Sequence, residues 1–130
     1  MENNLSLEVL NNVSEIDIVY KRKATCKVSQ RPLISSSSDG YKVCLHYWNR
    51  DKIELLEEFK VLFLSRANRV LQILQVSQGG ITGTVADPRL ILAAAIKSLS
   101  VSIVLSHNHP SGNLKPSRAD EELTLKIKEA

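Results

Sequence analysis

Two short apolar segments, residues 59–64 and 101–105, restrict the fold of this chain more than any other feature. The first reads Phe-Lys-Val-Leu-Phe-Leu and the second Val-Ser-Ile-Val-Leu. Runs of this length that are almost continuously apolar are typical of strands buried on both faces of a sheet. The sequence therefore predicts two buried strands.

Turn signals after the first run predict further strands. Residues 65–68 supply turn chemistry before an apolar segment returns over residues 69–76, which predicts a β-hairpin that ends at Gln78-Gly79-Gly80. Residues 81–85 are a candidate third strand, and β-branched and aromatic residues predict a short strand over Ile16–Tyr20. Residues 1–13 are expected to form a loose tail.

Three segments carry helical signals. After a run of four serines, apolar residues at i, i+3, i+4 and i+7 predict a helix capped by Ser38 or Asp39, with His46 at its surface. The apolar stripe expected in the core is Tyr41, Cys44, Leu45 and Trp48. Asp87-Pro88 predicts the start of a helix that extends to Leu99, and Pro116-Ser117 opens a last helix toward Lys128. Strands mixed with helices indicate an α/β or α+β sandwich.

Size and composition exclude several classes of protein. The chain has 130 residues, 43% of them hydrophobic and 24% charged, which fits one soluble domain. Its longest apolar run, residues 90–96, is far shorter than the roughly 20 residues that cross a bilayer. The acidic, polar N-terminus lacks the features of a secretory signal, so we expect a cytoplasmic location. Cys26 and Cys44 lack CxxC spacing and are interpreted as ordinary thiols.

The charge pattern gives little support for nucleic-acid binding. The net charge is +3, and the tightest basic cluster is Lys21-Arg22-Lys23. Only Tyr20 adjoins this cluster as an aromatic residue, which makes a poor stacking platform for bases. We therefore interpret the cluster as a solvated face.

Residues 107–120 contain the pattern from which chemistry can be inferred. His107 and His109 follow the second buried strand, and side chains two residues apart on a strand project to the same side, so both imidazoles can bind one metal ion. Asp120 lies in the first turn of the last predicted helix, from which its carboxylate can fold back toward the histidines. These three ligands leave the fourth position of a zinc ion open, which is typical of a catalytic site.

Each part of this pattern also has a simpler interpretation. Paired histidines near the end of a strand are often hydrogen-bonded or surface residues. Ser117 and Asp120, spaced S-x-x-D before an amphipathic helix, can form an N-terminal capping box. Residues 110–112 can be turn residues alone. The metal-site hypothesis depends on all of these parts occurring together on a strand, a loop and a helix that converge.

A family resemblance rests on these residues. The stretch His107-Asn108-His109-Pro110-Ser111-Gly112, followed by Pro116-Ser117 and Asp120, resembles the signature of RadC-like proteins, members of the JAMM (MPN-plus) metalloprotease superfamily. Further matching positions are Glu57-x-Phe59, Asn68-Arg69-Val70, Gly80-x-x-x-Gly83-Thr84-Val85 and Asp87-Pro88. The resemblance implies a JAB/MPN-like (cytidine-deaminase-like) mixed β-sheet flanked by helices over residues 33–130, after an N-terminal tail and short strand over residues 1–32.

The resemblance also implies roles for individual residues. The family pattern H-x-H, seven residues, then S-x-x-D makes three residues zinc ligands: His107, His109 and Asp120. It makes Ser117 a polar group that stabilises the developing oxyanion. The family places a glutamate before the first core strand as the general base. Its E-x-F spacing favours Glu57, whereas strand alternation alone leaves both Glu57 and Glu58 open.

The implied activity is zinc-dependent hydrolysis of a peptide or isopeptide bond in a peptide or protein substrate. The alternative hypothesis is a metal-binding accessory protein without peptidase activity that acts in DNA repair or in the processing of mobile-element DNA, with DNA or DNA-repair proteins as partners. Domains of this family continue beyond the Asp120 helix with further strands, whereas this sequence ends at Ala130. We therefore expect a C-terminally truncated domain whose uncovered strand edge favours a homo-oligomer.

Overall fold

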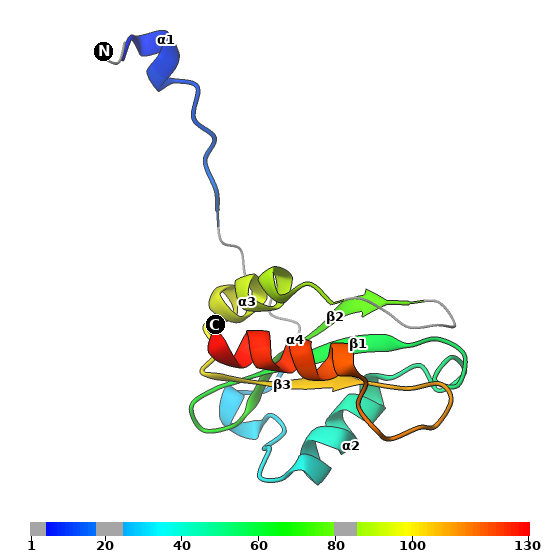
Figure 1. Ribbon diagram of the computed structural model, residues 1–130. Helices are drawn as coiled ribbons and strands as arrows, with labels where there is room; N and C mark the ends of the chain where they lie inside the picture. The colour runs from blue at the N-terminus through cyan, green and yellow to red at the C-terminus, as the bar shows by residue number, and fades with distance from the viewer. Residues whose placement is uncertain (1–4, 18–24, 80–85) are drawn as a thin grey trace.

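The computed structural model describes residues 5–17, 25–79 and 86–130 of the chain. Its centre is an antiparallel sheet of β1 (Glu58–Leu64), β2 (Val70–Gln78) and β3 (Ser102–His107), in the order β2-β1-β3. The longer helices of the described residues are α2 (Ser37–Tyr47), α3 (Pro88–Lys97) and α4 (Arg118–Glu129). Figure 1 shows α3 and α4 on one face of the sheet and α2 on the other. The predicted α+β architecture is therefore confirmed.

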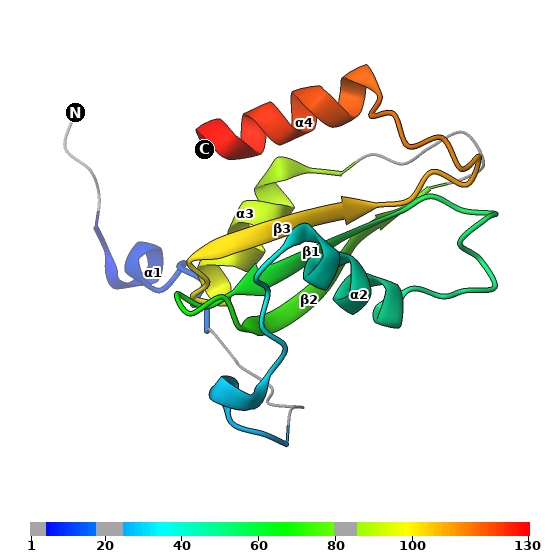
Figure 2. The same cartoon turned by 90° about the horizontal axis from the view of Figure 1, so that it is seen from below.

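Strand β1 is buried along its whole length, as its apolar run predicts. Alternate residues of a strand point to opposite faces, so β1 contributes to a core on each side of the sheet. One core contains Phe59, Val61, Phe63, Ile91 and Ile127, and the other contains Cys44, Trp48, Leu62, Leu64 and Val70. The first lies against α3 and α4, and the second lies on the α2 side, from which Figure 2 is viewed.

The register between β1 and β3 decides where the end of β3 points. The predicted hairpin of β1 and β2 is present, with Asn68 at a positive φ of 57° in its turn. β3 begins one residue later than predicted and continues two residues further, to His107. Phe59 lies opposite His107 in this pairing. Since opposed residues of antiparallel strands share a face, the His107 side chain points to the α3 and α4 face.

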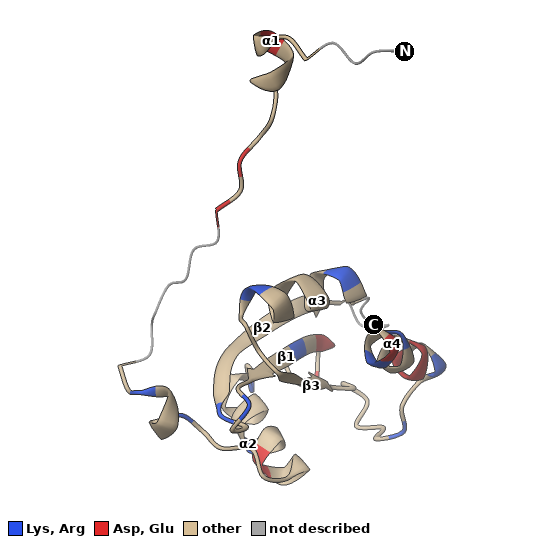
Figure 3. Cartoon of the chain, turned by 90° about the vertical axis from the view of Figure 1, so that its left-hand side faces the viewer, with Lys and Arg blue, Asp and Glu red and all other residues tan. Residues whose placement is uncertain are grey.

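Helices α3 and α4 begin where their capping sequences predict. The Asp87 carboxylate accepts the Arg89 N–H (2.9 Å), and Pro88 is the first residue of α3. Ser117 caps α4, which carries acidic residues in its first turn and basic residues in its last, as the helix dipole favours. Figure 3 shows that residues of both charges lie on this helix. The position of Asp120 in the first turn of α4 is therefore fixed by local sequence.

Helix α2 begins earlier than predicted. Its N-cap is Ser36, whose hydroxyl accepts the Asp39 N–H (3.3 Å), and neither Ser38 nor Asp39 is the cap. The buried stripe is Gly40, Cys44 and Trp48. Tyr41 is 64% exposed and Leu45 half-buried, so the expectation that Tyr41 belongs to the core is wrong. His46 is exposed, as predicted.

The N-terminal region differs from the expected tail. Residues Leu7–Leu10 form a single helical turn, α1, because the Ser6 hydroxyl accepts the Val9 N–H (3.4 Å), and η1 (Val28–Gln30) is a short 3₁₀ turn. Residues 12–17 have no regular structure, so the predicted strand is absent at residues 16 and 17. Its remaining part, the basic cluster at residues 21–23 and the candidate strand at residues 81–85 lie outside the described residues.

The cysteines and the helix lengths were also subjects of expectations from the sequence. Neither Cys26 nor Cys44 forms a disulfide. Among the described helices, none combines the length and the apolar character that a bilayer crossing needs.

Candidate metal centre

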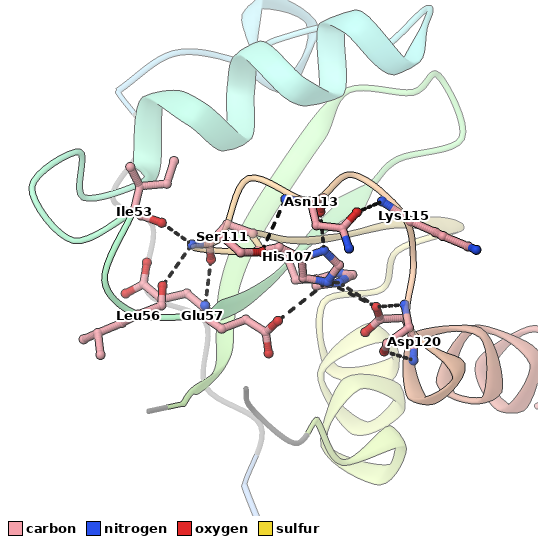
Figure 4. A network of polar contacts seen from close by, with 12 residues as sticks. Ile53, Leu56, Glu57, His107, Ser111, Asn113, Lys115 and Asp120 are labelled. Atoms are coloured by element: carbon pink, nitrogen blue, oxygen red, sulfur yellow. Dashed lines mark hydrogen bonds and ion pairs between the residues drawn. The ribbon is translucent and has the colours of Figure 1, made fainter. Parts of the chain in front are cut away.

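The side chains of His107 and His109, at the end of β3 and just beyond it, meet the side chain of Asp120 from the first turn of α4. The Nε2 atoms of His107 and His109 are 3.0 Å apart. Oδ2 of Asp120 lies 3.2 Å from Nε2 of His107 and 3.3 Å from Nε2 of His109. The structure therefore brings together the three residues that the sequence nominates as ligands, at the end of β3 and the start of α4 (Figure 4).

The two histidines are held by different neighbours. The His107 ring stacks on the opposed Phe59 ring, with centroids 5.6 Å apart and planes 7° apart. His109 lies beyond the strand, where Nδ1 is 2.7 Å from the Asn113 carbonyl oxygen. Gly112, whose φ is +78°, lets the loop turn back so that its N–H donates to the His109 carbonyl (2.9 Å). The loop between β3 and α4 therefore orients the second imidazole.

The contact with Asn113 determines the tautomer of neutral His109. A backbone carbonyl oxygen only accepts hydrogen bonds, so Nδ1 must carry the proton that it donates. Nε2 of the neutral ring then has a lone pair, and this atom faces His107 and Asp120. Histidines that bind a metal through one ring nitrogen usually donate a hydrogen bond from the other, often to a backbone carbonyl.

Asp120 has two functions in the geometry. Its Oδ2 accepts the Ser117 N–H (2.7 Å), and its own N–H donates to the Ser117 hydroxyl (3.1 Å), which completes a capping box. The simpler interpretation of S-x-x-D is therefore correct, yet the same carboxylate oxygen also faces both histidines. Partial burial opposes ionisation, but hydrogen bonds with Ser117 and the nearby His107 lower the pKa of Asp120 overall. The carboxylate thus favours its ionised form, which is the form that can bind a cation.

The donor set fits a zinc ion. Tetrahedral zinc holds nitrogen and oxygen ligands at about 2.0–2.2 Å, which places neighbouring donors roughly 3.3–3.6 Å apart. The three donor atoms here are 3.0–3.3 Å apart, close to that spacing, and each side chain is only 20–22% exposed. Three protein ligands leave one position for water or substrate.

The two candidate glutamates lie on different faces of the sheet. Oε1 of Glu57 is 3.7 Å from Nε2 of His109, and Figure 4 shows Glu57 and Asp120 on opposite sides of His107. Glu58 is 5% exposed and lies 3.9 Å from the Lys60 ammonium within the α2 side of the sheet. The geometry therefore favours Glu57 as the carboxylate beside the metal centre.

A cavity of about 220 Å³ adjoins these residues and gives access to them. Its wall combines site residues with apolar side chains from the start of α3 and from α4. Its lining includes Glu57, Phe59, His107, Asp120 and Leu123. The cavity therefore borders Glu57 together with two of the candidate ligands, His107 and Asp120.

Sequence reasoning missed two asparagines near the site. Asn113 orients His109 through its main-chain carbonyl, a contact that no side-chain motif could reveal. Asn108 lies between the histidines, and strand alternation places its side chain on the face opposite to theirs. There it bonds the segment that carries Glu57.

Comparisons with known proteins identify a family and several relatives of this chain. The model of the RadC-like JAB domain matches residues 34–130. A UPF0758 protein of Flavobacterium johnsoniae is 49% identical over 74 residues, which are 57% of this chain and 32% of that protein. A UPF0758 protein of Caldanaerobacter subterraneus is 35% identical over 138 aligned residues, covering 98% of this chain and 58% of that protein. The chain thus spans 32–58% of the length of these curated relatives.

Proposed function

The chain belongs to the RadC-like JAB domain family, and from this premise we propose that it is a zinc-dependent hydrolase that cleaves a peptide or isopeptide bond. The observation that carries the proposal is the convergence of two imidazole nitrogens and one carboxylate oxygen within 3.0–3.3 Å of one another. His107, His109 and Asp120 would hold the ion. When bound, zinc lowers the pKa of a coordinated water to about 7 and polarises a carbonyl group.

Glu57 has the position of a general base. Its carboxylate lies at the cavity wall, 3.7 Å from the His109 ring nitrogen that faces the centre. From there it can accept a proton from the attacking water and deliver it to the leaving amine. A carboxylate beside the ligands, rather than among them, suits proton transfer because it keeps its own lone pairs for the proton.

Ser117 can combine capping with transition-state stabilisation. Its oxygen accepts the Asp120 N–H at 3.1 Å, an interaction that does not use the hydroxyl proton. That proton can be donated to the oxyanion that develops on the substrate carbonyl. Interactions of this kind are worth roughly 3 kcal/mol in acyl transfer.

The proposal is tested by hydrolysis assays on zinc-loaded protein with a panel of peptide and isopeptide substrates. We expect turnover that a chelator removes and added zinc restores, and that His107→Ala lacks under the same conditions. A folded, zinc-loaded chain that cleaves no member of the panel would contradict hydrolysis and favour the accessory, metal-binding alternative.

A further inference from the structure

The side chain of Asn108 joins the metal-binding loop to a segment of the chain far from it in sequence. Its Nδ2 donates to the Ile53 carbonyl (2.6 Å) and to the Leu56 carbonyl (2.9 Å). Its Oδ1 accepts the Glu58 N–H (2.8 Å). All three partners are main-chain atoms at least 50 residues earlier in the chain. We call these three hydrogen bonds the Asn108 clamp.

The clamp holds the backbone on both sides of Glu57. The Leu56 carbonyl precedes Glu57, and the Glu58 N–H follows it. The Glu57 carbonyl itself accepts the Gly79 N–H (2.8 Å), which ties the same residue to the end of β2. The backbone from which the Glu57 carboxylate extends is therefore fixed from two directions, and Asn108 supplies one of them.

The ligands and the clamp are adjacent in sequence. Because side chains alternate, His107 and His109 face the metal centre while Asn108 faces residues 53–58. One tripeptide thus sets the positions of two ligands and, through the clamp, of the carboxylate beside them. Only a short primary amide fits the contacts, because two donors and one acceptor are used at once.

We propose that Asn108 is a positioning residue that keeps the Glu57 carboxylate at the metal centre. The inference rests on the proposed function in one respect, the use of Glu57 as the general base. A displacement of about 1 Å in a reacting group can cost about 10²-fold in rate. Loss of the clamp should therefore lower turnover without removing any metal ligand.

The clamp itself is tested first, without metal or substrate, by amide hydrogen exchange of the full chain. In Asn108→Ala the Glu58 amide should exchange about tenfold faster, because its hydrogen-bond acceptor is gone. Asn49→Ala is the matched control: Asn49 lies in the exposed segment that leads into residues 53–58, and its side-chain oxygen accepts the local Asp51 N–H (3.0 Å). It should leave Glu58 exchange unchanged.

A milder variant keeps the test decisive if Asn108→Ala does not fold. Asn108→Asp retains the size and the acceptor but cannot donate to the two carbonyls. It should loosen residues 53–56 while the Glu58 amide stays more protected than in Asn108→Ala. Unchanged exchange at residues 53–58 in every folded Asn108 variant would overturn the clamp.

Positioning of Glu57 is then measured by NMR on protein loaded with Co²⁺, a paramagnetic ion for the same kind of ligands. Broadening of the Glu57 carboxylate signal, which falls steeply with distance from the ion, should decrease in Asn108→Ala but persist at Asp120. Wild-type protein that binds no Co²⁺ would contradict the metal site and hence the proposed function. Protein that binds Co²⁺ with equal Glu57 broadening in wild type and variant would contradict the positioning role alone.

Kinetics supply the readout that a purely structural role would not give. On a substrate that the wild type cleaves, Asn108→Ala should lower kcat about 10–100-fold with KM little changed. If Asn108 acts through Glu57, the double variant with Glu57→Gln should be no slower than Glu57→Gln alone. Losses that multiply in the double variant would overturn the inference.

Discussion

Glu57 and Glu58 are adjacent in sequence but have opposite surroundings. Glu57 lies on the α3 and α4 face, at the wall of a cavity that it shares with His107 and Asp120. Glu58 lies on the α2 face, buried to 5% exposure. At the start of β1, therefore, a glutamate on one face of the sheet borders a cavity, and a glutamate on the other face is buried. One face keeps its charges accessible, and the other encloses them.

The enclosed face gives its buried lysine several partners, whereas Oε2 of Glu58 accepts no hydrogen bond within the described part of the chain. The Lys60 ammonium lies 3.9 Å from Glu58, donates to the Gln75 side-chain carbonyl (2.7 Å) and sits 5.2 Å from the centre of the Trp48 ring. Burial raises the pKa of the neighbouring Cys44 thiol, so this cysteine is kept neutral. Since buried charges need such partners, we assign this cluster to the stability of the fold rather than to chemistry.

The largest expected effect separates the two glutamates by turnover. Glu57→Gln keeps the volume and all three proposed zinc ligands, so zinc content should be unchanged while turnover falls by about 10²–10⁴-fold. Glu58→Gln, the matched control, should lower turnover far less. Zinc analysis and hydrolysis rates measured on the same samples check both statements.

Two results would break this assignment. Equal rates for wild type and Glu57→Gln would show that Glu57 is not the base. A selective loss in Glu58→Gln would move the role to the buried glutamate and contradict the difference between the two faces.

The next effect concerns stability on the enclosed face. Lys60→Met leaves the Glu58 carboxylate buried beside an apolar side chain, and breaking a buried ion pair in this way typically costs about 3–5 kcal/mol. Urea denaturation should show that loss, with zinc content unchanged in the protein that is still folded. The double variant with Glu58→Leu should regain much of it. A Lys60→Met protein as stable as the wild type would show that the cluster does not stabilise the fold.

Two N-cap serines, one on each face, allow a comparison in which the expected loss of stability is smaller. Ser117 caps α4 beside the metal centre, and Ser36 caps α2 on the enclosed face, each accepting the N–H of the third helical residue. Replacement of either serine by alanine should cost about 1 kcal/mol in unfolding free energy. Only Ser117→Ala should also lower turnover, by about 10²-fold. Equal turnover in the two variants would reduce Ser117 to a cap.

The smallest effect is the acid sensitivity of the metal-free protein. The folded state lowers the pKa of Asp120, so its contribution to stability is present above the unfolded value of about 4 and is lost as pH falls through the lower folded value. Asp120→Asn should therefore show a shallower loss of stability below about pH 4, measured by denaturation across pH. Identical acid profiles would contradict the hydrogen-bonded, ionised state of Asp120.

Much of this fold was predictable because its signals are local. The apolar run of β1, the hairpin turn, Asp87-Pro88 before α3 and Ser117 before α4 each determine their elements without help from distant residues. The start of α2 was mispredicted because four consecutive serines offer several caps. Tyr41 was assigned to the core because the apolar pattern does not show that the helix packs through Gly40, Cys44 and Trp48, which leaves Tyr41 exposed.

The sequence nominated three candidate ligands that the fold brings together, whereas strand alternation left the choice between Glu57 and Glu58 open and only the E-x-F spacing of the family favoured Glu57. Strand alternation correctly separates Glu57 from Glu58, yet it cannot say which face carries the histidines. The pairing of Phe59 with His107 decides that, and this register is a tertiary property. The contacts of Asn108 depend likewise on where a loop 50 or more residues away comes to lie.

The central claim, that His107, His109 and Asp120 form a metal centre, is tested most directly by elemental analysis after dialysis against zinc and then against zinc-free buffer. We predict about one zinc per wild-type chain and loss of most of it in folded His107→Ala, since two ligands hold zinc more weakly than three. Folded wild-type protein that takes up no zinc, or His107→Ala protein with the zinc content of the wild type, would contradict the account.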